Sequence, residues 1–323
     1  MKSKAGKKDK SINLLILALI AGLCLMIYPS LANFINQRTA TRAIATYSED
    51  VVKIKPEDYS KMIDAAKEYN KRLLAEENPL ARFEKVPGYN DILNIGDTGI
   101  MGVINIDKIN VELPIYHGTS EEILNVAVGH MQGSSFPVGG KGTHAVLTGH
   151  RGLPSARLFT DLDQLQEGDT FTITVLDQTV TYTVDQIRIV PPTEVDDLKI
   201  VPDDDYFTLR TCTPYGINTH RLLVRGTRTS NAKINPMLYV QNDGSLVNPL
   251  ITAPSFGLMI LLAIIVVQKL RKLQKKKKAE KLMKEQEEEQ NKEQTQTAEK
   301  EIPQDAQQSD SQNNPNPDEE QKQ

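Results

Sequence analysis

The stretch TLRTCTPYG at residues 208–216 is the feature from which the fold of this chain can be read. It completes a run of strand-forming residues at 206–212, and a second such run follows at 221–227 after a turn that contains Pro, Gly and Asn. This pattern predicts two short strands joined by a turn. Cys212 ends the first strand and Arg221 begins the second. If the strands pair antiparallel, both residues lie at the same end of a sheet.

Further short strands are predicted upstream of this pair. Runs rich in β-branched residues, or alternating between apolar and polar residues, occur at 101–106, 111–116, 143–148, 169–176 and 180–190. The last two are joined by a turn near Asp177 and Gln178, as in a β-hairpin. About seven short strands with one or two small helices predict a mainly β fold, a closed or nearly closed β-barrel.

A helical segment precedes the strands. Residues 37–77 carry apolar side chains at helical spacing, and Pro56 suits the first turn of a helix. Residues 78–98 show no sustained period, so we expect an extended loop there.

Two apolar runs, at 12–28 and 248–267, flank the strand-rich part. With an extension to residue 35, the first is about long enough to cross a bilayer, as is the second. Basic residues precede the first run and follow the second, which predicts two transmembrane helices with both termini in the cytoplasm. The alternative for the first run is a cleaved signal peptide ending near Ala32. The alternative for the second run is a buried helix.

The C-terminal tail changes sign along its length. Residues 269–278 hold seven basic side chains and no acid, as expected beside anionic lipid. Residues 279–323 hold 13 acidic side chains and five Lys, with few apolar residues. Such a composition predicts a disordered segment.

Cys212 is a candidate nucleophile. Cys24, the other cysteine of the chain, lies within the first apolar run, so Cys212 has no evident disulfide partner outside the membrane. Nucleophilic catalysis by a thiol also needs an acid/base group and a group that stabilises an oxyanion.

The acid/base group is expected among the five histidines, because the pKa of imidazole lies near neutrality. His150 has the best context, since it follows a predicted strand and stands between Gly149 and Gly152. The remaining histidines are expected to be structural; they are His117, His130, His144 and His220. Arg221 is the candidate oxyanion donor, ahead of Arg225 and Arg228, which lie farther along the strand.

These residues carry a family resemblance. TLRTC at 208–212, followed nine residues later by Arg221, resembles the signature of sortases, and TGH at 148–150 resembles their histidine motif. The surrounding sequence resembles class C, the pilin-polymerising sortases of Gram-positive bacteria. The similar stretches are LPIYHGT at 113–119, GH at 129–130, FPVGG at 136–140 and CTPYGINTHRL at 212–222. The resemblance covers about residues 40–230.

The resemblance implies an eight-stranded sortase β-barrel with an N-terminal helical extension. Cys212 would attack the Thr carbonyl of an LPxTG-like sorting signal and form a thioacyl enzyme. His150 would act as general acid/base, and Arg221 would hold the carbonyl or oxyanion. The acceptor would be a pilin Lys amine. This chemistry needs no metal and no organic cofactor. The partners expected are LPxTG-containing proteins and the lipid bilayer, with no nucleic acid, and the oligomeric state is not indicated.

The resulting domain plan has seven parts. They are a basic cytoplasmic N-terminus at 1–11, a transmembrane signal-anchor at 12–35, a helical extension with a lid loop at 36–98, the extracellular catalytic barrel at 99–230, a linker at 231–247, a transmembrane helix at 248–267 and a cytoplasmic tail, basic and then acidic and disordered, at 268–323.

One departure from class C concerns the lid. The family carries an Asp-Pro-aromatic motif there, and the equivalent in this chain is Asn78, Pro79 and Leu80. Asn cannot form an ion pair with Arg221, and Leu cannot stack as an aromatic ring does. We therefore expect a lid that latches weakly, or one whose role passes to Phe83 or Tyr89.

Three other functions are compatible with the sequence. One is a sortase that anchors a surface protein to peptidoglycan. Another is a hydrolase of the thiol-protease type. The third, from a different class, is a non-catalytic, membrane-tethered scaffold for pilus assembly in which Cys212 is a core residue.

Overall fold

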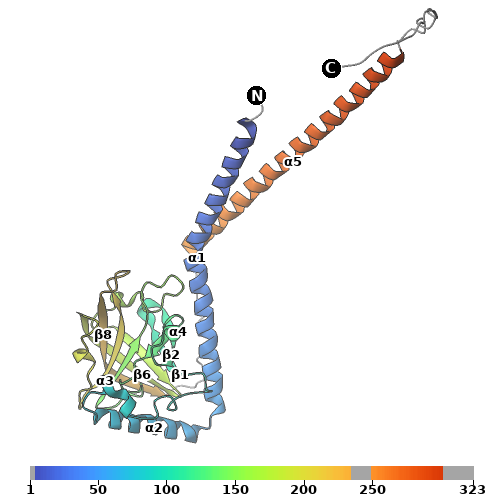
Figure 1. The fold of residues 1–323 in the computed structure, drawn as a ribbon. Helices are drawn as coiled ribbons and strands as arrows, with labels where there is room; N and C mark the ends of the chain where they lie inside the picture. The colour runs from blue at the N-terminus through green and yellow to red at the C-terminus, as the bar shows by residue number, and fades with distance from the viewer. Residues whose placement is uncertain (1–3, 234–248, 301–323) are drawn as a thin grey trace, which may run out of the picture. The chain divides into compact units, whose positions relative to one another are not determined.

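A computed structural model describes residues 4–233 and 249–300 of the chain (Figure 1). It divides into two compact units, Met1–Ser255 and Phe256–Gln323. The helices are α1 (Lys4–Lys53), α2 (Pro56–Leu74), α3 (Pro79–Arg82), α4 (Glu121–Leu124) and α5 (Pro249–Lys300). The strands are β1 (Ile100–Ile106), β2 (Val111–His117), β3 (Val128–His130), β4 (Thr143–Thr148), β5 (Thr170–Val175), β6 (Gln178–Val190), β7 (Asp205–Thr213) and β8 (His220–Lys233).

The eight strands form a closed barrel in the order β1-β2-β3-β4-β7-β8-β6-β5, which confirms the predicted mainly β barrel. Pairing of β1 with β5 closes it. Two neighbouring pairs, β2–β3 and β4–β7, run parallel, and the others run antiparallel. The parallel pairing of β4 with β7 places the ends of these strands side by side, although they are about 60 residues apart in the chain.

The barrel interior is filled by one face of each strand. On β7, the alternate residues Phe207 and Leu209 are fully buried in the core. Arg210 and Cys212, which follow them at the alternate positions of the strand, are half-buried and face outward. This alternation puts Arg210 and Cys212 on the outer surface of the barrel.

The N-terminal helices belong to the same core. Tyr47 of α1 accepts a hydrogen bond from the Leu176 backbone N–H at 2.9 Å and donates to Met101 O at 3.4 Å. Asn70 of α2 donates to Phe136 O at 3.2 Å and accepts from the Phe136 N–H at 2.7 Å. Figure 1 shows α2 lying along the barrel. α2 begins at Pro56, as predicted.

Two predicted segments differ in the structure. The expected extended loop at 78–98 contains α3 and a 3-10 turn at Phe83–Lys85. The tail expected to be disordered from 279 onward is helical to Lys300, while 301–323 lie outside the described residues. Its Lys and Glu side chains favour a helix and pair one turn apart, as Lys281 and Glu285 do at 3.4 Å.

The predicted transmembrane segments fall within α1 and α5. Across the residues that the structure describes, we find no helix both long enough and apolar enough to cross a membrane. The two membrane spans therefore stay predictions. The predicted linker at 231–247 begins within β8, and its part after Lys233 lies outside the described residues.

Candidate active site

The register of three strands brings the predicted site residues together. β7 and β8 pair antiparallel with Cys212 directly opposite Arg221, as the sequence predicted. β4 and β7 pair parallel from Thr143 opposite Asp205 to Thr148 opposite Arg210. The same offset, continued for two residues, brings His150 level with Cys212.

Two hydrogen bonds carry this register beyond the end of β4. The Gly149 N–H donates to Arg210 O at 3.1 Å, and the Thr211 hydroxyl donates to Gly149 O at 2.7 Å. Cys212 and Arg221 thus occupy one row on β7 and β8, and His150, two residues beyond the end of β4, continues this row; neighbouring strands are about 4.8 Å apart. Their positions in the alternation put all three on the outer face, and all three are half-buried.

The backbone on either side of His150 is tightly constrained. A Cβ atom at Gly149 would lie 2.7 Å from the Phe159 ring, so only glycine fits there. The Phe159 N–H in turn donates to His150 O at 3.1 Å. A closely packed aromatic ring therefore fixes where the His150 backbone lies.

Arg151 connects the His150 loop to the strand that carries Cys212. Its Nη1 donates to Thr213 Oγ1 at 3.2 Å, and its Nη2 is ion-paired with Asp163. Only 9% of its side chain is exposed. Arg151 thus connects the His150 loop both to the end of β7 and to the segment that carries Asp163. The sequence analysis did not assign it this role.

Cys212 has a free thiol, and cations lie beside it. Arg221 donates from Nη1 to Asn218 O at 3.1 Å and to His220 O at 3.0 Å, which holds the guanidinium against the β7–β8 turn. Arg210, two residues before Cys212, is a second cation on the same face. Burial lowers the pKa of Arg210, and the nearby charge of Arg221 lowers it further. The sequence analysis did not single out Arg210.

The remaining histidines have structural surroundings. His130 is fully buried between the Tyr89 hydroxyl, 2.9 Å from Nδ1, and Ser135 O, 2.8 Å from Nε2. His144 is buried between Lys199 O and the Thr208 hydroxyl. Burial lowers the pKa of each of these two histidines to about 4.

The other two histidines differ in exposure. Both ring nitrogens of His117 lie beside backbone carbonyls, Nδ1 3.0 Å from Gly99 O and Nε2 2.7 Å from Ile92 O. His220 is exposed, and its Nδ1 lies 3.0 Å from the neighbouring Thr219 hydroxyl.

An apolar patch lies on the outer face of the barrel, beside the row formed by His150, Cys212 and Arg221. We call it the outer apolar cluster; its members are Val146, Val190, Leu198 and Leu223. Leu223 is opposite Arg210 in the β7–β8 register, and Val190 is opposite Arg221 in the β6–β8 register, so the cluster reaches the levels of both Arg210 and Cys212. Leu80, Met131 and Val195 pack against it.

The predicted lid contacts this cluster. Leu80 of α3 rests on it, and a Cβ atom at Gly133 would lie 2.5 Å from Pro79 O, so the lid backbone meets the barrel closely. Asn78 is exposed, and its carbonyl accepts hydrogen bonds from the backbone N–H groups of Ala81 and Arg82. The hydrogen bonds of Arg221 go to its own turn, not to Asn78.

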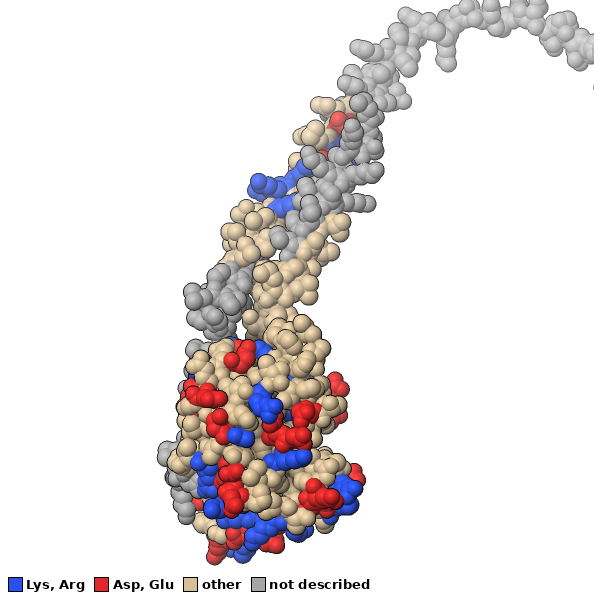
Figure 2. All heavy atoms as spheres, turned by 90° about the vertical axis from the view of Figure 1, so that its left-hand side faces the viewer, with Lys and Arg blue, Asp and Glu red and all other residues tan. Residues whose placement is uncertain are grey.

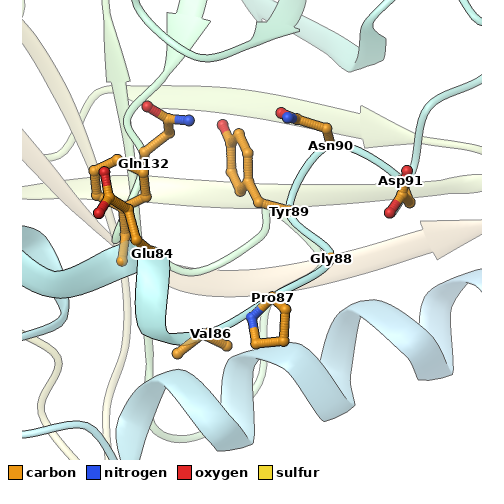
Figure 3. Close-up of a pocket in the computed structure, with 9 residues that line it drawn as sticks. Glu84, Val86, Pro87, Gly88, Tyr89, Asn90, Asp91 and Gln132 are labelled. Atoms are coloured by element: carbon orange, nitrogen blue, oxygen red, sulfur yellow. The ribbon is translucent and has the colours of Figure 1, made fainter.

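Tyr89 anchors the segment that follows the lid. Its hydroxyl donates to His130 O at 3.1 Å and accepts from the Gly118 N–H at 2.9 Å, and its ring stacks on Phe136 with centroids 5.4 Å apart. It lines a pocket of about 280 Å³ beside Gln132; Figure 3 shows the side chains of Glu84, Val86, Pro87, Tyr89, Asn90 and Asp91 along this loop. Tyr89 is therefore a buried anchor, whereas Phe83 is a half-buried member of the pocket wall.

No metal-ligating group is evident in the part of the chain that the structure describes, since no three His, Cys, Asp or Glu side chains there are close enough to hold an ion.

Comparison with known proteins identifies the family. A family model described as a sortase domain matches residues 104–229. The crystal structure of sortase C1 from Streptococcus agalactiae is 51% identical, with a TM-score of 0.55, and the match covers 59% of this chain and all of that one. The chain belongs to the sortase family. Sortases are cysteine transpeptidases, and the solved structures similar to this sortase are of class C.

Two further relatives support this assignment. The structure of Clostridium perfringens sortase C with the C-terminal cell wall sorting motif is 44% identical to this sortase, with a TM-score of 0.52, over 59% of this chain and all of that one. Sortase D of Bacillus subtilis (strain 168) is 29% identical over 132 residues, 40% of this chain. This sortase spans 64% of the length of that curated relative, slightly less than two thirds.

Proposed function

We propose that this chain is a membrane-anchored cysteine transpeptidase that cleaves an LPxTG-like sorting signal between Thr and Gly and transfers the acyl group to a pilin Lys amine. The observation that carries the proposal is the row of His150, Cys212 and Arg221 across β4, β7 and β8. A thiol with an imidazole on one side and a guanidinium on the other has the groups that acyl transfer requires.

The first half of the reaction forms a thioester. The Cys212 thiolate attacks the Thr carbonyl carbon, and the negative charge that develops on the oxygen accepts hydrogen bonds from the Arg221 guanidinium. The Thr–Gly C–N bond then breaks, and His150 donates its proton to the departing amine. Arg221 is already held at the turn by Asn218 O and His220 O, so little reorganisation is needed.

The second half resolves the thioester. A Lys amine attacks the thioacyl carbon and gives its proton to His150, and the Cys212 sulfur leaves as thiolate. The product is an isopeptide bond, and the enzyme returns to its starting state. The thioester conserves the acyl-transfer potential of the cleaved bond, so no ATP is consumed.

The lid fits this reaction as a cover. Leu80 occupies the outer apolar cluster, which is the apolar surface on the Cys212 face suited to the Leu-Pro end of a sorting signal. A substrate would displace Leu80. Because Asn78 makes no ion pair with Arg221, the lid is held mainly by apolar contact and by its close approach to Gly133.

Membrane anchorage through 12–35 and 248–267, with the barrel outside the cell, is part of the proposal. It is supported by the apolar composition of both runs and by their basic flanks. The check is fractionation of the expressing cells, with protease added to intact protoplasts. The barrel should be degraded from outside, and both termini should stay protected.

The acyl intermediate is the direct test of the chemistry. The full-length chain in neutral detergent micelles is incubated with an LPxTG peptide and analysed by mass spectrometry. We expect an adduct on Cys212 that is absent from Cys212→Ala. An adduct that persists in Cys212→Ala would reject this nucleophile.

A second step of the same test identifies the acceptor. A pilin Lys peptide and a peptidoglycan stem-peptide amine are offered separately to the acyl enzyme. Preferential transfer to the Lys peptide supports polymerisation, and transfer to the stem peptide supports cell-wall anchoring. Release by water alone supports a hydrolase.

A further inference from the structure

Arg210 is a half-buried cation that forms no ion pair with an acidic side chain in the described part of the chain, and the opposite charge that raises its pKa is that of Cys212, the proposed nucleophile. Among residues 4–233 and 249–300, no acidic side chain forms an ion pair with it, and its guanidinium makes no hydrogen bond. Other arginines of the barrel are paired, Arg188 with Asp197 at 2.7 Å and Arg225 with Asp185 at 2.8 Å. A partly desolvated guanidinium that is left unpaired is costly, so an external partner would be favourable.

The neighbour of Arg210 in the sheet also carries a polar group that has no partner in the described part of the chain. Thr148 of β4 is in register with Arg210, and its hydroxyl is buried without a hydrogen-bond partner in the described part of the chain. Two polar groups side by side on the outer face therefore lack internal partners. Such groups are commonly satisfied by a ligand or by water.

The position of Arg210 relative to Cys212 indicates which part of a ligand it meets. Arg210 lies two residues before Cys212 on the same face, about 6.6 Å along the strand. Leu223 of the outer apolar cluster is directly opposite Arg210. A peptide whose Thr carbonyl is at Cys212 and whose Leu-Pro end contacts Leu223 runs beside Arg210, within reach of the long Arg side chain from the residue between Pro and Thr.

We propose that Arg210 selects an acidic side chain at the variable position of the sorting signal, the residue between Pro and Thr. The proposal rests on the proposed function, because it assumes that Cys212 is acylated by such a peptide. A carboxylate there would pair with the Arg210 guanidinium.

The mixed charge on one face of the molecule and the short range of screened charges favour a local origin for this selectivity. Figure 2 shows Lys and Arg interspersed with Asp and Glu over the face of the molecule in view, rather than a field of one sign. Surface charges farther than about 8 Å are screened at physiological salt. Discrimination by charge must therefore come from a group close to the peptide, as Arg210 is.

The test compares three peptides that differ only at the variable position, Leu-Pro-Glu-Thr-Gly, Leu-Pro-Gln-Thr-Gly and Leu-Pro-Lys-Thr-Gly. kcat/KM for acylation of the full-length chain is measured for each. We expect the Glu peptide to be favoured over the Lys peptide by roughly fivefold to tenfold, and the difference to shrink at high salt.

Variants assign the preference to Arg210. Arg210→Met should abolish the preference for the Glu peptide over the Lys peptide, Arg210→Glu should invert this preference, and Arg210→Lys should retain it. Arg188→Gln is the matched control, because it removes one positive charge from β6, which is separated from β7 by β8, and the preference for Glu over Lys should survive. A merely structural role of Arg210 would lower kcat/KM equally for all three peptides.

Two results would overturn the inference, and they differ. If the wild-type chain is acylated by all three peptides at one rate, or if the order survives in Arg210→Met, the specificity role is rejected while the proposed function stands. If no peptide acylates the wild-type chain, the proposed function fails and this inference fails with it. Arg210→Lys keeps the test decisive should Arg210→Glu fail to fold.

Discussion

Arg151 is a single residue that connects parts of the site that are distant in the chain. It follows His150 directly, donates to Thr213 next to Cys212, and pairs with Asp163 in the following loop. Its Nε is buried and has no hydrogen-bond partner in the described part of the chain. Since a planar guanidinium can bond in two directions at once, Lys is not an equivalent replacement.

Arg151→Lys should therefore impair catalysis more than stability. We expect kcat for acyl transfer to fall about tenfold to a hundredfold, because a small displacement of a catalytic group is costly. The free energy of unfolding should fall by only about 1–2 kcal/mol, since Asp163 is half exposed. Steady-state kinetics and urea unfolding check the two effects.

Arg157→Lys is the control for this prediction. Arg157 lies in the same loop and pairs with Asp161, but 63% of its side chain is exposed. Its replacement should change neither kcat nor stability appreciably. Equal kinetics for the two variants would show that Arg151 does not position the site.

The difference between the predicted and the missed residues has a physical cause. Cys212 and Arg221 could be paired from sequence because a short turn joins their strands, which fixes the register locally. Arg151 and Arg210 depend on the parallel pairing of β4 with β7, two strands far apart in the chain. No local pattern specifies which side chains such a pairing places together.

At the scale of elements, the strands were more predictable than the lid. β4 coincides with the predicted strand at 143–148, because its apolar residues serve both the interior and the covered outer face. α3 has only four residues and no period of its own. Its contacts with the outer apolar cluster and with Gly133 stabilise it, and the sequence does not reveal those contacts.

Leu80→Ala should loosen the lid and leave the barrel intact. The truncated side chain loses apolar contact with the outer apolar cluster, so the lid should open more often. We expect Cys212 to react several-fold faster with a small methanethiosulfonate reagent. Because Leu80 is only half-buried, the free energy of unfolding should fall by about 1 kcal/mol or less.

Two further variants make the lid experiment specific. Arg82→Ala changes an exposed residue of the same helix and should leave the modification rate unchanged. Gly133→Ala puts a Cβ atom 2.5 Å from Pro79 O, so it should displace the lid and raise the rate as Leu80→Ala does. If neither Leu80→Ala nor Gly133→Ala alters the rate, α3 does not cover Cys212.

At the scale of the whole molecule, buried histidines tie the stability of the barrel to pH. His130 joins the Tyr89 segment to the barrel, and His144 joins the β6–β7 segment to β4. Burial lowers the pKa of both to about 4 from an ordinary value of 6.5. Between these two values the unfolded chain binds protons that the folded chain excludes, so stability falls as the pH falls through 6.5 toward 4.

Lowering the pH from 7.5 to 5 should therefore cost about 2 kcal/mol of unfolding free energy for each of the two histidines. The carboxyl groups whose pKa is lowered, among them Asp169 beside Lys108, lose their contribution only below pH 3.8, outside this window. Urea unfolding of the full-length chain at pH 7.5, 6 and 5 measures the slope. His144→Gln should make the slope shallower, whereas His220→Gln, at an exposed position, should not change it. Equal stability of the wild-type chain at pH 7.5 and pH 5 would mean that neither imidazole is held neutral by the fold.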